Sequence, residues 1–163
     1  MAMNTELVVL RILHIVSGVF WAGAAVYLAV VLEPKLRQIG GSVERDVLQA
    51  ISKLNSYWIT GSAIVTILAG FALVSRTPGR GFDQLFSNGW GTAIGIGLVA
   101  SLLSFFLSGM VGANTAKLRR GLADGSASGD VVAKLQARIA LGSRVNALLV
   151  LIAVGTMAAA RYV

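Results

Sequence analysis

The chain has 163 residues, of which 56% are apolar and only 13% are charged. That charged fraction is about half of what a soluble domain carries, so the composition points to a protein of the lipid bilayer. Cysteine is absent, which excludes disulfides, thiolate metal sites and covalently attached c-type haem. The basic residues behind the net charge of +7 lie mainly in the loops and do not form one basic face. No nucleic-acid partner is therefore expected.

Four apolar stretches follow one another along the chain. They cover residues 7–32, 57–75, 91–113 and 143–162. Each is near the roughly 20 residues that a helix needs to cross a bilayer core. The first run is too long for a cleaved signal segment, and it lacks the basic residues with which such a segment begins. The sequence therefore predicts an all-α, integral membrane four-helix bundle that forms a single domain over residues 1–163.

The segment after the first span has two features. Pro34 is expected to end the first helix, because proline cannot donate the helical hydrogen bond. Between residues 42 and 55, apolar side chains such as Val43, Val47 and Ile51 recur on one helical face. Charged residues, Glu44 among them, largely avoid that face. This pattern predicts a short amphipathic helix between helices 1 and 2 that lies on the membrane surface.

Basic residues are concentrated in the two segments that connect spans 1 and 2 and spans 3 and 4. Nine of them lie there: Lys35, Arg37, Arg45, Lys53, Lys117, Arg119, Arg120, Lys134 and Arg138. The positive-inside rule puts both segments in the cytoplasm and both termini in the periplasm. The expected location is the bacterial inner membrane, which the chain crosses several times.

Polar residues within the spans are few. The third span carries a stripe of small residues, from Gly97 through Ser101, Ser104 and Ser108 to Gly112, which is typical of close helix packing. None of the four spans contains Asp, Glu or Lys. Coupled carriers generally need such a charge inside the membrane, so a transporter or pump is disfavoured. The sequence nominates no catalytic residue.

The only histidine, His14, lies in the first span within the stretch LHIVSGVFWAG. It shares a helical face with Gly18 and Trp21. One interpretation is a histidine that hydrogen-bonds between helices; the other is an axial ligand of haem iron or a ligand of copper. Counting from the helix ends puts Met157 at the depth of His14.

Several glycines are expected at the same depth, including Gly70 and Gly97. A layer without side chains could admit a flat macrocycle, or it could serve helix packing alone. The candidate cofactor-binding residues are therefore His14, Met157, Gly18, Trp21, Gly70 and Gly97, with His14 and Met157 as the candidate metal ligands.

Two stretches carry a family resemblance. LHIVSGVFWAG resembles the first helix of CopD-like membrane domains and of related uncharacterised bacterial four-helix membrane proteins. The ending SRVNALLVLIAVGTMAAARYV is similar to the last helix of those relatives. The resemblance implies copper handling at the inner membrane, with His14 and Met157 as the natural ligands.

A more distant likeness is to the four-helix protoporphyrinogen oxidase. In that family the first helix carries a haem-linked histidine, which His14 would match, and a later helix carries a lysine. Here Lys117 lies at the cytoplasmic end of the third span rather than within it. This departure argues against protoporphyrinogen oxidation.

The leading expectation is a small inner-membrane protein that binds haem b or copper through His14, with a role in redox chemistry or copper handling. The alternative is a non-catalytic accessory or scaffold subunit of a larger membrane complex, with no cofactor. Its small-residue stripes would then face partner helices or a second copy of the chain, and His14 would only hydrogen-bond.

Overall fold

The computed structural model describes residues 5–163, apart from the side chains at positions 41, 45, 48 and 52–55. Of the described residues, 88% are helical and none forms a strand. The elements in order are α1 (Thr5–Tyr27), the π-helix η1 (Leu28–Leu32), α2 (Glu33–Ile39), α3 (Gly41–Arg76), the 3₁₀-helix η2 (Phe82–Gln84), α4 (Gly89–Ala123) and α5 (Gly129–Ala159). Four of the resulting helical runs are long and apolar enough to cross a membrane, which confirms the predicted all-α membrane bundle.

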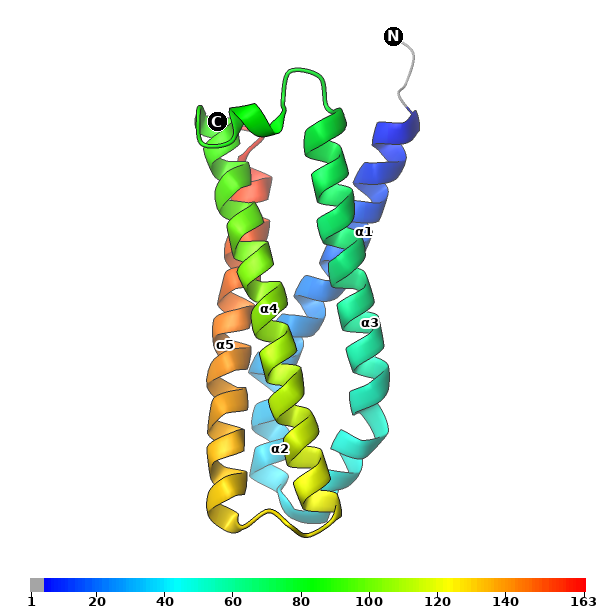
Figure 1. Cartoon of the computed structure of the whole chain (residues 1–163), viewed down its shortest axis with the longest axis vertical. Helices are drawn as coiled ribbons and strands as arrows, with labels where there is room; N and C mark the ends of the chain where they lie inside the picture. Colours follow the sequence, from blue (N-terminus) through cyan, green and yellow to red (C-terminus); the bar gives the residue numbers. More distant parts are fainter. Residues whose placement is uncertain (1–4) are drawn as a thin grey trace.

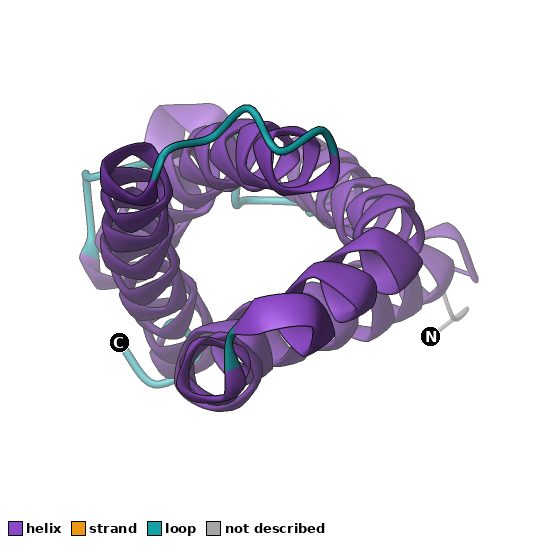
Figure 2. Cartoon of the chain, turned by 90° about the horizontal axis from the view of Figure 1, so that it is seen from below, coloured by secondary structure: helices purple, strands orange, loops and turns teal. Residues whose placement is uncertain are grey.

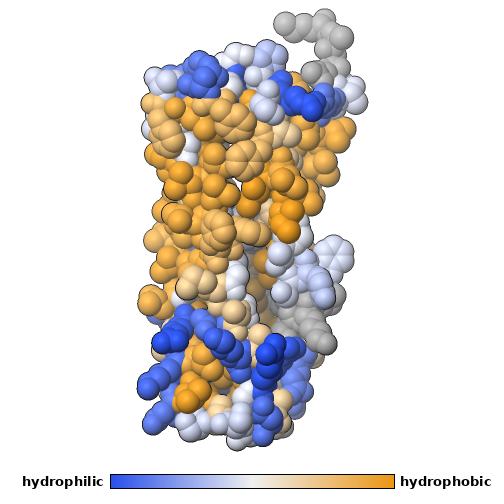
Figure 3. Space-filling view, in the orientation of Figure 1, coloured by the Kyte–Doolittle hydropathy of each residue, from blue (hydrophilic) through white to orange (hydrophobic). Residues whose placement is uncertain are grey.

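The four long helices run alternately down and up (Figure 1). The start of α1 and the C-terminus therefore lie at the same end, called the upper end here. Most contacts are made within two helix pairs, α1 with α3 and α4 with α5, and fewer are made between the pairs. Seen from below, the helices surround a common axis (Figure 2). On the face shown in Figure 3, an apolar band lies between two hydrophilic ends, as a bilayer requires.

Pro34 does not end the first helix, which corrects the expectation from the sequence. The helical path continues through η1 and α2 to Ile39, and the whole run from Thr5 to Ile39 is one candidate span. Pro34 directly follows η1, where the hydrogen-bonding pattern changes and the Glu33 N–H donates to the Leu28 carbonyl oxygen. The path ends at Gly40, whose φ of +63° is a left-handed conformation that favours glycine.

The predicted amphipathic stretch 42–55 is helical, but it is the beginning of α3 rather than a separate element. Figure 1 shows this lower part of α3 bending toward α2. One of its charged residues departs from the predicted pattern. Glu44 is buried, and both of its carboxylate oxygens accept hydrogen bonds from Nε2 of Gln136 in α5, at 2.9 and 3.1 Å. The start of α3 therefore contacts the bundle.

Small residues fill the interface between α4 and α5. Gly97, Ser101 and Ser104 of the predicted stripe are buried, whereas Gly112 is exposed. Ser104 donates a hydrogen bond to Oδ1 of Asn146 at 2.6 Å, and both residues are buried. Lipid supplies no hydrophobic reason for helices to associate, so close backbone approach and such polar contacts stabilise the pair. The buried part of the stripe therefore packs against α5, and its last residue, Gly112, lies at the surface.

Candidate functional site

His14 lies in the upper half of the bundle and contacts α3. Its Nδ1 is 2.8 Å from the backbone carbonyl oxygen of Thr66. A carbonyl oxygen only accepts hydrogen bonds, so Nδ1 carries a proton, and in the matching neutral tautomer the lone pair is on Nε2. Nε2 makes no hydrogen bond to any residue that the structure describes. The half-buried imidazole thus has one nitrogen fixed and one available as a ligand.

Two of the predicted glycines hold this arrangement. A Cβ atom at Gly70 would lie 3.0 Å from Cε1 and 3.2 Å from Nδ1 of His14, closer than ordinary contacts allow. A Cβ atom at Gly18 would lie 3.4 Å from the Thr66 methyl group. Gly70 therefore admits the imidazole edge to the surface of α3, and Gly18 allows α1 to approach the same helix.

Trp21 lies on the same face of α1 as His14 and is only 3% exposed. Its Nε1–H is buried and has no hydrogen-bond partner in the described part of the chain. A buried donor without an acceptor costs about 1–3 kcal/mol. Trp21 therefore adds a donor to this part of the interior that a bound group could satisfy.

Met157 lies in a different helix interface from His14. A Cβ atom at Gly97 would lie 2.8 Å from Cγ and 3.0 Å from Cε of Met157, so this side chain packs between α5 and α4. His14, by contrast, packs between α1 and α3. The structure brings His14 together with Gly70, and Met157 together with Gly97. Ligation of one metal by both side chains stays a prediction.

The donors close to His14 restrict the kind of metal site. Among the described residues, no group of three or more His, Cys, Asp or Glu side chains could hold a metal ion. A haem supplies four nitrogen ligands itself and needs only one axial ligand from the protein. Copper needs further protein donors, such as the thioether of Met157. A haem and a copper ion therefore differ in the number of protein ligands that they would need besides His14.

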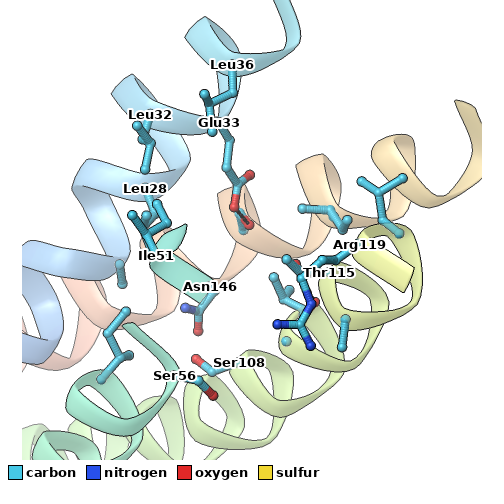
Figure 4. Close-up of a pocket in the computed structure, with 18 of the residues that line it drawn as sticks. Leu28, Leu32, Glu33, Leu36, Ile51, Ser56, Ser108, Thr115, Arg119 and Asn146 are labelled. Atoms are coloured by element: carbon cyan, nitrogen blue, oxygen red, sulfur yellow. Dashed lines mark hydrogen bonds between the residues drawn. The ribbon is translucent and has the colours of Figure 1, made fainter. Parts of the chain in front are cut away.

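A half-buried carboxylate at the lower end, Glu33, is not among the residues predicted from the sequence. Glu33 belongs to the helical run from Thr5 to Ile39, so the first membrane helix does contain an acidic residue. Its Oε1 accepts a hydrogen bond from Ser143 of α5 at 2.6 Å, and its Oε2 is 3.5 Å from Arg37. Figure 4 shows the carboxylate pointing into a cavity between the helices.

The signal for Glu33 was present in the sequence. Trp21, Ala25 and Ala29 are all buried and follow one another at steps of four residues. The next step on that face is Glu33. Glu33 lies directly before Pro34, where the sequence predicts the end of the span.

Comparison of the chain with protein-family models, with curated proteins and with solved structures found no match. The likeness to CopD-like membrane domains therefore stays a prediction.

Proposed function

We propose that this chain is a small multi-pass protein of the bacterial inner membrane that binds a haem or a copper ion through Nε2 of His14. The hydrogen bond between Nδ1 and the Thr66 carbonyl oxygen carries the proposal. Histidines that bind metals almost always donate their other ring N–H to a carbonyl or carboxylate oxygen, which fixes the tautomer and the ring orientation. His14 meets this requirement without a metal-binding cluster around it.

The remaining predicted residues have defined parts in this proposal. Gly70 and Gly18 keep the imidazole against α3, and the unpartnered Nε1–H of Trp21 could donate to a polar edge of the bound group. Met157 is the proposed second ligand. Ligation by both side chains would place the cofactor between the α1–α3 pair and the α4–α5 pair. A bound haem or copper would supply one-electron redox chemistry, which fits a role in electron transfer or copper handling.

The orientation in the membrane is also part of the proposal. Basic side chains are concentrated at the lower end, where Figure 3 shows the hydrophilic surface below the apolar band. The positive-inside rule then puts this end in the cytoplasm and both termini in the periplasm. The beginning of α3 lies at the cytoplasmic interface. A periplasm-active reporter fused after Val163 should be active, and an inactive fusion would overturn this orientation.

Spectroscopy of the purified protein tests the cofactor. The full chain is purified in mild detergent, and its visible spectrum and metal content are measured together with those of the His14→Ala and Met157→Leu variants. We expect a Soret band, or bound copper, that disappears in His14→Ala. Met157→Leu should keep the cofactor with a changed ligand-field spectrum. A wild-type protein that is colourless and free of metal would refute the proposal.

One observation favours the second candidate function, an accessory or scaffold subunit. Each membrane helix has an exposed glycine, and a Cβ atom there would meet nothing within 4 Å: Gly23, Gly61, Gly109 and Gly155. Such positions allow another transmembrane helix, or a second copy of the chain, to approach closely. This candidate predicts a colourless protein that co-purifies with partner subunits or with itself in a fixed ratio, and that dissociates when the glycines are replaced by leucine.

A further inference from the structure

The lower half of the bundle encloses a cavity of about 470 Å³ (Figure 4). All four membrane-spanning runs contribute to its walls. The volume lies within the range of roughly 300–1,000 Å³ that is usual for small-molecule sites. The cavity is separate from the His14 region, whose residues do not line it.

The walls of the cavity contain apolar side chains together with equal numbers of acidic and basic side chains. Apolar side chains come from α1, η1 and α3, with Ala25, Leu28 and Ile59 among them. Four charged residues also line it, two acidic and two basic: Glu33, Glu44, Arg37 and Arg119. Their formal charges cancel. A ligand that combines an apolar body with a neutral or zwitterionic polar group matches this lining better than an ion does.

Two polar side chains in the wall lack partners for part of their hydrogen-bonding capacity. Oγ of Ser108 is buried and has no partner in the described part of the chain. Asn146 is 8% exposed, and its Oδ1 accepts from Ser104, but its Nδ2 donates to none of the described residues. Figure 4 shows Ser108 and Asn146 close together at one side of the cavity. Acceptor oxygens of a ligand would satisfy both groups.

The cavity reaches the surface that faces lipid. Ser56, Tyr57 and Thr60 of α3 line it and are exposed, with Tyr57 at 79%. Gly112 of α4 also lines it and is exposed, and a Cβ atom there would meet nothing within 4 Å. Both helix segments belong to candidate membrane spans. The cavity therefore opens sideways between α3 and α4, where an amphiphile can enter from the bilayer.

We propose that this cavity binds the head of a zwitterionic phospholipid, of the phosphoethanolamine type, from the adjoining leaflet. Figure 4 shows Glu33 and Arg119 pointing into the cavity from different walls. The lipid ammonium group binds Glu33, and the phosphate binds Arg119 through charge-assisted hydrogen bonds. The ester oxygens accept from Ser108 and Asn146. The acyl chains leave through the opening between α3 and α4.

Native mass spectrometry tests this assignment directly. The full chain is reconstituted with an equimolar mixture of phosphatidylethanolamine and phosphatidylglycerol and then released gently from detergent. We expect one retained lipid per chain, with phosphatidylethanolamine preferred by about tenfold, the effect of one charge-assisted hydrogen bond. A protein that retains no lipid, retains both lipids equally, prefers phosphatidylglycerol or retains a different amphiphile would overturn the proposal.

Two variants locate the lipid within the cavity. Gly112→Leu places a large side chain at the opening and should reduce lipid retention about tenfold. Its matched control is Gly109→Leu, which lies on the same helix, is equally exposed and does not line the cavity. Glu33→Gln should remove the preference for phosphatidylethanolamine. Equal retention in the two glycine variants, or an unchanged preference in Glu33→Gln, would contradict the assignment. Because the readout is a lipid mass, it is independent of any cofactor at His14.

Discussion

Small residues have opposite effects in the packed upper half of the bundle and around the cavity in its lower half. In the upper half, glycines receive the side chains of neighbouring helices: Gly70 receives His14, and Gly97 receives Met157. In the lower half, Gly142 receives Val111 in the same way, whereas Ser108 and Gly112 border a cavity. Small residues alone therefore predict neither a packed interface nor a binding site. The side chain opposite them decides which one forms.

The largest expected effect lies at the upper end, where the loop after α3 folds onto the first turn of α4. A Cβ atom at Gly91 would lie 2.7 Å from the backbone carbonyl carbon of Gln84 and closer still to its oxygen. Backbone cannot move aside as a side chain can. Gly91→Ala should lower the free energy of unfolding in detergent by about 3 kcal/mol. Denaturant titration followed by circular dichroism measures it.

The matched control for this substitution is Gly109→Ala on the same helix. A Cβ atom at Gly109 would meet nothing within 4 Å, so this variant should be neutral or slightly stabilised. Equal stability of the Gly91→Ala and Gly109→Ala variants would show that the loop does not close the upper end tightly.

A second contrast lies one helical turn apart on α4. The Ser104 hydroxyl donates to Asn146, whereas the buried Ser108 hydroxyl has no partner among the described residues. Ser104→Ala should lower the free energy of unfolding by about 1–3 kcal/mol, because it leaves a buried acceptor unsatisfied. Ser108→Ala should leave it unchanged or raise it, because it removes a buried hydroxyl that has no partner in the described part of the chain. Thermal unfolding of lipid-free protein in detergent compares the two, and a larger loss in Ser108→Ala would reverse the assignment of packed and open regions.

The contact between Gly70 and His14 permits a smaller, position-specific test. Gly70→Ala forces the imidazole to shift by a few tenths of an ångström and weakens its bond to the Thr66 carbonyl. The cost offsets the gain in helix propensity of about 1 kcal/mol that alanine brings. Gly61→Ala on the same helix brings that gain alone, since nothing lies near its Cβ position.

The two α3 variants should therefore differ by about 1 kcal/mol in the free energy of unfolding, with Gly61→Ala the more stable. Chemical unfolding of both proteins in the same detergent measures the difference. If Gly70→Ala is as stable as Gly61→Ala, the imidazole does not occupy the place of the missing side chain.

The smallest effect is expected outside both halves, in the loop between α4 and α5. The hydroxyl and the backbone N–H of Ser126 both donate to Oδ1 of Asp124, at 2.6 and 3.0 Å, and lower the pKa of that carboxyl group. Because the folded-state pKa is depressed, this contribution to stability is present above the unfolded-state pKa. It is lost as the pH falls through the folded-state value.

Ser126→Ala should raise the pKa of Asp124 toward its ordinary value, because the hydroxyl donor is removed. Titration of the Asp124 carboxyl carbon by NMR measures the shift. Ser128→Ala, in the same loop, should leave the pKa where it is. A pKa that is unaffected by Ser126→Ala would mean that the hydroxyl does not stabilise the carboxylate.

The membrane helices could be predicted from the sequence, whereas their ends could not. Hydropathy marks the apolar part of a helix because lipid requires it. It does not mark polar turns that continue the helix beyond that part, and α4 runs to Ala123 although the predicted span ended at residue 113. The prediction that Pro34 ends the first helix was wrong for a related reason. Proline is compatible with a change of hydrogen-bonding pattern, and here the π-helix η1 precedes it.

For the candidate site, too, one part could be predicted from the sequence and another part could not. Counting along the helices placed Gly70 at the depth of His14 and Gly97 at the depth of Met157, and both pairs are in contact. Counting residues along a helix gives the depth of a side chain in the membrane. It does not show which neighbouring helix that side chain faces. The sequence therefore could not reveal that His14 and Met157 lie in separate interfaces.

The cavity in the lower half could not be predicted either, because its lining depends on which helices face one another. Its charged lining combines Glu33 and Arg37 of α2 with Glu44 of α3 and Arg119 of α4. No local pattern connects these positions. Only the bend of α3 toward α2 and the pairing of the helices bring them together.

The central claim is that the two halves bind different ligands independently, a cofactor at His14 and a phospholipid in the lower cavity. Native mass spectrometry of the His14→Ala and Gly112→Leu variants, prepared side by side with the wild type, tests it most directly. The account predicts that His14→Ala loses the cofactor mass and keeps the lipid, and that Gly112→Leu loses the lipid and keeps the cofactor. Loss of both masses in either variant, or of neither in both, would contradict it.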